Sequence, residues 1–367
     1  MLISTHSSGT RVPAVLMRGG TSRGPFILER DLPADTQHRD RALLEIMGSP
    51  NSLQLGGIGG GDPLTSKVAI IAPSERPGID VEYLFAQVGV TQPVVDTSPN
   101  CGNMLSAVGP FAIEAGLVRP GDRETTVRIY NRNTGTSVHA VVQTPGGLVT
   151  YEGDAEIDGV PGSAAPIKLT FLDATGSKTG GLFPTGKRRE IINDIAVSLV
   201  DYAMPMMLVK AADLSLAGDE APEVLDSRPD LFRQLEAMRR EAGRRMGLGD
   251  VSNAVIPKIG ILSGPRREDG TITSRYLVPH RTHRAHAVTG ALCVAVAARS
   301  AGTVAYEVAR AEDGSGTVLV EHPSGKLSID LDMGDDGMVR RASLIRTARR
   351  IFEGNVILSG MDGAGTD

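Results

Sequence analysis

The residues best suited to chemistry lie together in the segment Asn100-Cys101-Gly102-Asn103, which opens an apolar run typical of a helix. The free N–H groups and the dipole at the start of a helix favour a bound anion. A cysteine in that position is exposed and activated for thiol chemistry. The segment therefore predicts a reactive thiol beside an anion-binding site.

A second helix start of similar composition, Ala287-Val288-Thr289-Gly290, lies later in the chain and lacks the cysteine. The two apolar runs end in Ala115-Gly116 and Ala301-Gly302, 186 positions apart, which sets Ala287 opposite Cys101. The chain thus offers two anion-binding helix starts, of which only the first can do thiol chemistry.

Three further pairs of segments resemble one another in the same chain order, at offsets of 182, 191 and 190 residues. They are anchored on Asp31 and Asp213, Lys67 and Lys258, and Gly135 and Gly325. Ordered offsets of similar size indicate a tandem duplication with small loop insertions. The turn-rich stretch 180–187 fits the junction, so we expect two segments, 1–183 and 184–367.

Bulk composition excludes several classes of partner. The chain has 367 residues and a net charge of −5, with no basic run and no tryptophan, so nucleic acid and anionic membranes are poor partners. No apolar stretch reaches about 18 residues, which predicts a soluble protein. The two cysteines, Cys101 and Cys293, fit a reducing cytoplasm. Cys293 lies within an apolar run and is expected to be inert packing, and Met1–His6 lacks the features of a secretory signal.

The expected elements are mostly short strands around two helices. Two Ala/Val-rich runs, 104–117 and 289–304, carry almost no charge, which is typical of buried helices. Runs bounded by glycine and proline predict strands over 81–90, 124–130, 138–142, 317–320 and 327–331. An amphipathic helix is expected over 229–246. The predicted fold is α+β, with two similar halves that each wrap β-structure around a central helix.

The glycine-rich stretch Gly56–Lys67 resembles a phosphate loop at first sight. It lacks the Gly-Lys-Ser/Thr of a P-loop, and a strand-like run, Val68–Ile71, follows where a nucleotide-binding fold needs a helix. A flexible glycine loop can instead let a ligand approach the backbone and present Lys67 at the head of a strand. The alternative is a solvated lysine at a strand end.

A second small-residue turn, Met17-Arg18-Gly19-Gly20-Thr21-Ser22-Arg23-Gly24, lies between two β-like runs. Its hydroxyls, glycine N–H groups and two arginines can cradle a carboxylate. The alternative is a tight hairpin with exposed arginines.

Three histidines, His280, His283 and His286, form a further candidate cluster. On a helix, residues six apart are turned by about 600°, so the outer two do not share a face. Metal sites also usually recruit an acidic or cysteine ligand, and none lies in this segment. We therefore expect no metal here, and expect Arg281 and His286 to face an anionic substrate.

Several of these motifs together resemble the PrpF-type isomerases, relatives of diaminopimelate epimerase. The resemblance is carried by Met17–Ser22, Asp62–Lys67, Asn100–Asn103, Pro279–Arg281 and Thr289–Gly290, so it spans nearly the whole chain. Within the family, the likeness is greatest to 4-oxalomesaconate isomerases and tautomerases of protocatechuate and lignin-derived aromatic breakdown. The family fold is a pair of similar β-barrel-like lobes, each around a central helix, with the active site in the cleft between them.

The resemblance implies a cofactor-free isomerase that moves a double bond in an unsaturated di- or tricarboxylate by allylic proton transfer. The epimerase relatives use one cysteine from each lobe, and Ala287 at the second position argues against a two-thiol epimerase. Lys67 matches the lysine that family members place opposite the cysteine. We expect Lys67 to act as the base and Cys101 as the acid.

The partner implied is a small polycarboxylate substrate. The substrate-binding residues implied are Arg18, Thr21, Ser22, Ser66, Asn100, Gly102, Asn103, His280, Arg281, Thr289 and Gly290. N–H groups at the helix starts can hold the charge of a dienolate, and Arg18, Arg23 and Arg281 can bind carboxylates and favour a neutral lysine. Neither a cofactor nor a metal is expected, and a homodimer is compatible with the sequence.

Three other functions remain compatible with the sequence. The first is 2-methylaconitate cis-trans isomerisation, because the side chains that choose between substrates cannot be placed from the sequence. The second is a metal-dependent hydratase or hydrolase that uses His280, His283 and His286. The third is a carboxylate-binding protein without catalytic activity.

Overall fold

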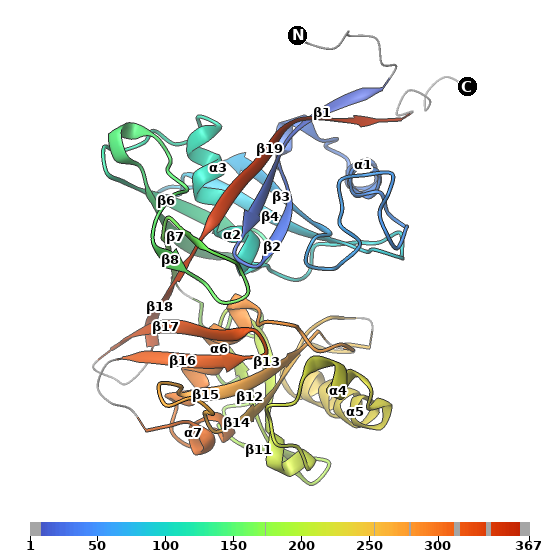
Figure 1. Cartoon of the computed structure of the whole chain (residues 1–367). Helices are drawn as coiled ribbons and strands as arrows, with labels where there is room; N and C mark the ends of the chain where they lie inside the picture. Colours follow the sequence, from blue (N-terminus) through green and yellow to red (C-terminus); the bar gives the residue numbers. More distant parts are fainter. Residues whose placement is uncertain are drawn as a thin grey trace.

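The computed structural model describes residues 9–172, 174–252, 254–278, 280–311, 316–334 and 339–359. They form a mixed α+β fold that is mostly sheet, with few helices (Figure 1). Seventeen strands of the described residues are joined by backbone pairing into one sheet, and two short strands form a separate ribbon.

The strands fall into a first and a second set along the chain. The first set comprises β1 (Thr10–Gly19), β2 (Ser22–Leu28), β3 (Lys67–Pro73), β4 (Val81–Val88), β5 (Val95–Asp96), β6 (Glu124–Asn131) and β7 (Thr136–Gln143). The second set comprises β12 (Ile195–Asp201), β13 (Pro205–Lys210), β14 (Lys258–Ser263), β15 (Ile272–Leu277), β16 (Thr317–His322) and β17 (Gly325–Met333). The strands outside these sets are β8 (Ala155–Glu156), β9 (Ser163–Ala164), β10 (Ile167–Leu172), β11 (Glu190–Ile192), β18 (Val339–Arg346) and β19 (Ala348–Leu358).

The same succession of pairings occurs in both sets. In the first, β1 and β2 are antiparallel, β2 and β3 parallel, β3 and β4 antiparallel, β4 and β6 parallel, and β6 and β7 antiparallel. In the second, β12 to β17 pair in the same alternating order. Lys67 and Lys258 are each the first residue of the third strand in this succession.

The first set of strands surrounds two short helices in place of the single helix expected over 104–117. They are α2 (Gly102–Leu105) and α3 (Val108–Glu114). Pro110 explains the interruption, because its ring clashes with the carbonyl of Ser106 in a continuous helix and it has no N–H to donate. Nearly all residues of both helices are buried among the strands.

The second set surrounds α6 (Val288–Ala298), in which every residue is buried. An apolar surface on all sides suits this helix to the centre of a sheet structure. The helix ends before the expected residue 304 because Thr303 caps a separate short helix, α7 (Val304–Val308), by accepting from the N–H of Tyr306 at 3.0 Å. None of the helices in the described residues is long and apolar enough to span a membrane.

Other helices cover the outer faces of the strands (Figure 1). Helix α1 (Thr36–Met47) packs Leu43 and Ile46 in one outer core, and Asp35 caps its first turn. The helices α4 (Pro222–Asp226) and α5 (Pro229–Arg245) lie beside the second set, where α5 confirms the amphipathic helix expected over 229–246. Three short 3-10 helices complete the fold, η1 (Glu29–Asp31), η2 (Pro145–Gly147) and η3 (Ala211–Leu214).

Strands β10, β18 and β19 join the two sets. β10 pairs with β7 of the first set and with β18, β18 pairs with β17 of the second set, and β19 returns to pair with β1. Thus β19, which lies within the predicted segment 184–367, hydrogen-bonds to a strand of the segment 1–183. The division of the chain into these two segments stays a prediction.

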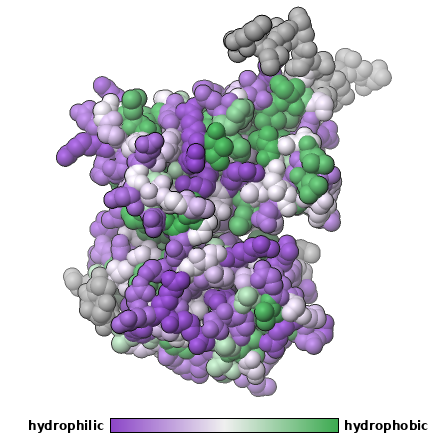
Figure 2. Space-filling view, in the orientation of Figure 1, coloured by the Kyte–Doolittle hydropathy of each residue, from purple (hydrophilic) through white to green (hydrophobic). Residues whose placement is uncertain are grey.

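Strand β19 carries exposed apolar side chains. Phe352 is 60% exposed, and Ile351 and Ile357 are also exposed. Figure 2 shows hydrophobic side chains grouped in the part of the molecule that contains β1 and β19, whereas the part below is mostly hydrophilic. This apolar surface lies on the outside of the first set, apart from the cavity described next.

Candidate active site

Lys67 is held in one orientation by the strand pair β3–β4. Its Nζ atom donates to Gln87 Oε1 at 3.1 Å and lies 5.0 Å from the centroid of the Phe85 ring. Gln87 is itself fixed, because its amide nitrogen donates to the carbonyl oxygens of Pro63 and Ser66 at 3.1 and 2.8 Å. Lys67 is only 8% exposed, so it is not a solvated lysine at a strand end.

The glycine-rich loop before Lys67 is tied down rather than flexible. The buried Gln54 accepts from the N–H of Gly61 at 2.9 Å and donates to Ser66 Oγ at 2.7 Å. Ser66 in turn donates to the carbonyl of Val88 at 2.9 Å. A Cβ atom on Gly59 would lie 2.2 Å from the Gln54 amide oxygen, so this glycine is needed for packing within the loop.

Cys101 lies immediately before α2, with its thiol next to Lys67. The distance from Lys67 Nζ to Cys101 Sγ is 3.6 Å, and Ser22 Oγ lies 4.0 Å from the sulfur. The buried Tyr83 donates to the Cys101 carbonyl at 3.2 Å, which fixes the backbone. Cys101 is 8% exposed, so the thiol and the amine form a close pair that is nearly shielded from solvent.

Lys67 and Cys101 face a cavity of about 240 Å³ between the two sets of strands. The first set contributes Ser22, Lys67, Phe85, Gln87, Asp96, Asn100, Cys101, Gly102 and Asn103, among others. The second set and its loops contribute Met204, Lys258, Tyr276, Arg281, His283, Ala287 and Val288, among others. The cavity therefore combines two lysines, an arginine, a carboxylate and a thiol with many apolar side chains.

The starts of the two central helices meet at this cavity. A Cβ atom on Gly102 would lie 2.7 Å from Val288 Cβ, which shows how closely α2 approaches α6. Both helix starts line the cavity, and the first N–H groups of α6 have no acceptor within the helix. The dipole of α6 thus favours negative charge in the cavity.

Burial lowers the pKa values of two nearby histidines and of one lysine. It lowers the pKa of Lys258 to about 7, with Arg239 and Lys67 lowering it further and Asp96 opposing them. Burial also lowers the pKa of His283 to about 3 and that of His286 to about 4. Around neutral pH Lys258 is therefore close to its titration midpoint.

The remaining residues with an expected binding role lie outside the cavity lining, and several have structural roles. Arg18 Nη1 donates to the carbonyls of Gly20 and Thr347 and to Thr347 Oγ1, so it joins the β1–β2 turn to the residue between β18 and β19. Thr21 Oγ1 accepts from the Asn103 amide at 3.1 Å and so positions a cavity residue. Ser66, Thr289 and Gly290 are buried packing residues.

The three clustered histidines do not come together. His280 is exposed and lines a separate hollow beside α5. His286 is buried, where its Nδ1 donates to the Ala287 carbonyl at 2.9 Å and its Nε2 accepts from Ser274 Oγ at 3.0 Å. Only His283 lines the cavity. Within the described ranges, no group of three or more His, Cys, Asp or Glu side chains is arranged to hold a metal ion.

Three polar cavity residues were not among the expected site residues: Gln87, Asp96 and Lys258. Lys258 had a signal in the sequence, because the duplication offset of 191 sets it opposite Lys67. No local motif marks Gln87 or Asp96, which reach the cavity only through strand pairing of β4 with β3 and β5.

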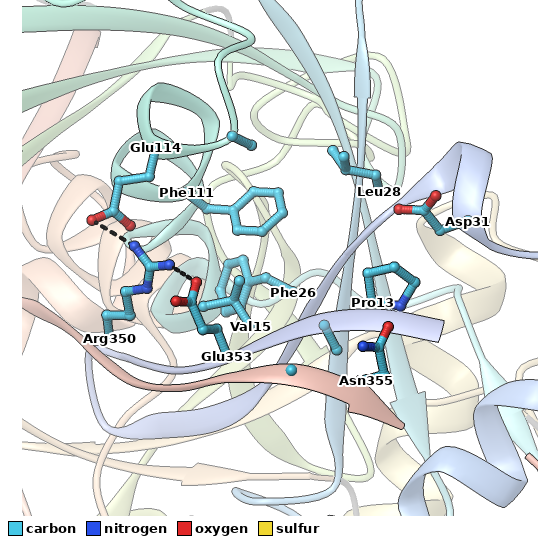
Figure 3. A pocket seen from close by; sticks show the side chains of 13 residues that line it. Pro13, Val15, Phe26, Leu28, Asp31, Phe111, Glu114, Arg350, Glu353 and Asn355 are labelled. Carbon is cyan, nitrogen blue, oxygen red and sulfur yellow. Dashed lines mark hydrogen bonds and ion pairs between the residues drawn. The ribbon is translucent and has the colours of Figure 1, made fainter. Parts of the chain in front are cut away.

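A different hollow, of about 370 Å³, lies on the outer side of the first set (Figure 3). Its floor is apolar, with Phe26 and Phe111, and Arg350 forms ion pairs with Glu114 and Glu353. Asp31 is a third carboxylate in its lining. Because carboxylates outnumber arginine here, this hollow disfavours an anionic ligand, and it contains none of the expected site residues.

The close packing of Gly290, near the start of α6, predicts that a larger residue there lowers the stability of the protein. A Cβ atom there would lie 2.3 Å from the ring of the buried Tyr276. We expect Gly290→Ala to lower the free energy of unfolding by about 1–3 kcal/mol through overpacking, measured by urea denaturation. Gly181→Ala is the matched control, because its Cβ meets nothing within 4 Å. An unchanged midpoint for Gly290→Ala would contradict this close packing.

Comparison with known proteins identifies the family to which the chain belongs. The family model described as PrpF protein matches residues 9–359. The chain is 52% identical to the "Putative isomerase YbhH" of Escherichia coli strain K12, over 95% of this chain and 99% of that protein. It is 48% identical to the "(4E)-oxalomesaconate Delta-isomerase" of Novosphingobium sp. strain KA1, over 94% of this chain and 97% of that protein.

A solved structure supports the same assignment. The crystal structure of a methylitaconate-delta-isomerase superimposes with a TM-score of 0.83 at 38% sequence identity, covering 98% of this chain and 100% of the other. Both the family model and the named relatives extend over almost the whole chain, including the residues of the cavity. The protein is therefore an isomerase that belongs to the PrpF family.

Proposed function

We propose that this isomerase moves a carbon–carbon double bond in an unsaturated di- or tricarboxylate by 1,3-allylic proton transfer, without a cofactor. The observation that carries the proposal is the 3.6 Å contact between Lys67 Nζ and Cys101 Sγ inside a cavity lined by cations. An amine and a thiol at this distance form an acid–base pair that can reach the two end carbons of one allylic system.

The chemistry requires one proton to leave one carbon and one to reach another. Lys67 takes the proton from a C–H next to a carboxylate or keto group, and the electron pair spreads into a dienolate. Cys101 then gives a proton to the far carbon of the allylic system, so the double bond moves by one position. Proton exchange with solvent or between the two groups restores both residues, and no oxidant or reductant is needed.

The cavity is suited to the charge that develops in this step. The dienolate concentrates negative charge on oxygen, and preorganised donors stabilise such charge most effectively where water is excluded. Arg281, Lys258 and the first N–H groups of α6 surround the cavity. Removal of a proton next to a carboxylate is therefore easier here than in water.

Among unsaturated polycarboxylates, we propose 4-oxalomesaconate as the substrate. The relative named (4E)-oxalomesaconate Delta-isomerase is 48% identical, against 38% for the methylitaconate-delta-isomerase of known structure. A place in aromatic-acid breakdown follows if this substrate is correct. 2-Methylaconitate is the alternative substrate, and its cis-trans isomerisation would use the same acid–base pair.

We also propose that the chain is a tandem duplication of two lobes, 1–183 and 184–367, with the cavity between them. The repeated succession of strand pairings supports this division. The duplication relates the positions of the two lobes to one another. The first lobe supplies Lys67 and Cys101, whereas the second supplies Lys258 and, at the position of the thiol, Ala287.

The test is proton NMR of 4-oxalomesaconate with the protein in D₂O after treatment with a chelator. We expect the vinyl signal to shift and deuterium to enter at the allylic carbon. If 2-methylaconitate reacts and 4-oxalomesaconate does not, the substrate assignment is wrong but the reaction class holds. If neither compound exchanges or isomerises, the allylic isomerase proposal is contradicted. Loss of activity on chelation would instead favour the metal-dependent alternative.

A further inference from the structure

We propose that Lys258 binds a carboxylate of the substrate and takes up a proton when the substrate binds. It would thus be a binding residue distinct from the acid–base pair Lys67 and Cys101. The inference rests on the proposed function, because it takes the ligand to be a polycarboxylate.

The side chain of Lys258 is buried without a partner. Lys258 is 6% exposed and lines the cavity. It makes no side-chain hydrogen bond and no ion pair with any residue that the structure describes, in contrast to Lys67, which donates to Gln87 and to Cys101. Because Lys258 lines the cavity and has no acceptor among the described residues, its amine is available to a ligand that supplies one.

The charged groups around Lys258 only partly compensate its charge, and they act in both directions. Asp96 from β5 favours the ammonium form, but its Oδ1 accepts two hydrogen bonds from Ser98. Arg239 from α5 and Lys67 from β3 both disfavour it. The positive charge of Arg239 is itself held by Glu236, through bonds of 2.6 and 2.9 Å.

The histidine next to Lys258 does not supply a charge either. The pKa of His283 is lowered to about 3, mainly by burial, and Lys258 itself is among the causes. His283 is thus neutral between pH 6 and 8, as is His286, whose pKa is about 4. Proton uptake in this pH range can therefore be assigned to Lys258 rather than to these two histidines.

The two lysines occupy equivalent positions in the fold but have different neighbours. Lys67 and Lys258 begin the equivalent strands β3 and β14, each parallel to the strand before it and antiparallel to the strand after it. Lys67 has a thiol within 3.6 Å, whereas the second helix start has Ala287 in the equivalent position. Lys258 therefore has no acid partner with which to shuttle a proton, and binding is the role left to it.

Because the charge of Lys258 and the binding of a carboxylate are linked, the inference predicts how proton uptake and affinity change with pH. A carboxylate next to Lys258 favours the ammonium form and raises its pKa above the free value of about 7. Below pH 7 the free residue is already charged, so binding takes up few protons. Above pH 7 it is mostly neutral, so binding takes up nearly one proton and affinity falls by about tenfold per pH unit.

The experiment uses isothermal titration calorimetry with propane-1,2,3-tricarboxylate, a saturated probe that cannot isomerise. Titrations at pH 6 and pH 8, each in two buffers of different ionisation enthalpy, give the number of protons taken up. After subtraction of the protons that the probe's own carboxylates release at pH 6, we expect about 0.1 proton at pH 6 and about 0.9 at pH 8 for the unmodified protein. Lys258→Met should abolish the uptake and weaken binding at pH 6 by about tenfold or more.

The controls separate a binding role from other roles. Lys168→Met replaces an exposed lysine on β10 and should change neither quantity. Binding by the unmodified protein with equal proton uptake at both pH values would overturn the inference without any variant. So would a Lys258→Met protein that keeps its affinity and loses only kcat, because that result assigns a base rather than a binding residue.

Failure of the inference can be told apart from failure of the proposed function. If the unmodified protein isomerises 4-oxalomesaconate in D₂O and Lys258→Met binds the probe normally, the inference alone is wrong. If the unmodified protein neither isomerises the substrate nor binds the tricarboxylate, the proposed function is wrong and the inference falls with it.

Discussion

Lys67→Met should lower kcat by about 10²- to 10⁴-fold, the range typical of a lost general base. Methionine reproduces most of the apolar stem of lysine, so the packing of the stem can persist while the proton acceptor and its contact with Phe85 are lost. Binding should survive, because Lys258 and Arg281 still line the cavity. The measurements are turnover of 4-oxalomesaconate by NMR and affinity for propane-1,2,3-tricarboxylate by calorimetry.

The matched control for Lys67→Met is Lys168→Met, which removes an exposed lysine from the same protein. It should retain the kcat of the unmodified protein. Turnover of Lys67→Met at the unmodified rate would remove Lys67 from the mechanism. Loss of binding with unchanged kcat would show instead that Lys67 holds the substrate and that another group removes the proton.

Cys101→Ser is the second variant for which we expect a loss of about 10²- to 10⁴-fold in kcat. A hydroxyl group occupies nearly the same place but is a far weaker acid than a thiol, so reprotonation of the dienolate becomes slow. The neighbours Ser22 and Lys67, at 4.0 and 3.6 Å from the sulfur, should retain their positions. Single-turnover NMR in D₂O can locate the defect, because proton abstraction should then outpace reprotonation.

Cys293→Ala is the control for Cys101→Ser, because it removes the other thiol of the chain. Cys293 is fully buried in α6, and burial raises the pKa of its thiol. Its Sγ atom donates to the Val200 carbonyl at 3.7 Å. We expect normal kcat and a loss of about 1 kcal/mol in the free energy of unfolding. Equal turnover of Cys101→Ser and the unmodified protein would remove the thiol from the mechanism.

Much of the fold followed from local patterns in the sequence. The strands expected over 124–130 and 317–320 are observed as β6 and β16, within two residues at each end. The prediction of a single helix over 104–117 was wrong in one respect, because two short helices are observed. The apolar pattern is continuous across the break that Pro110 explains, so it did not indicate the break. Apolar periodicity predicts that a segment is buried, but backbone sterics decide whether it is one helix or two.

Some of the residues expected at the candidate site line the cavity, and others do not. Asn100, Gly102 and Asn103 line the cavity because they are neighbours of Cys101 in the chain. Arg18 and His280 could not be placed from the sequence. The chain directs the Arg18 guanidinium to Thr347, more than 300 residues away, and exposes His280 beside α5. Local sequence identifies the type of side chain, whereas long-range contacts determine which way it points.

The sequence by itself determined the family of the protein, the candidate pair Lys67 and Cys101, and the presence of an equivalent lysine without an equivalent thiol. These are properties of residue type and spacing, and they survive without coordinates. Only the tertiary structure decided that the amine and thiol lie 3.6 Å apart and that Lys258 is buried with no hydrogen-bond acceptor among the residues that the structure describes. The physical reason is that distance, desolvation and charge arise from packing between segments far apart in the chain.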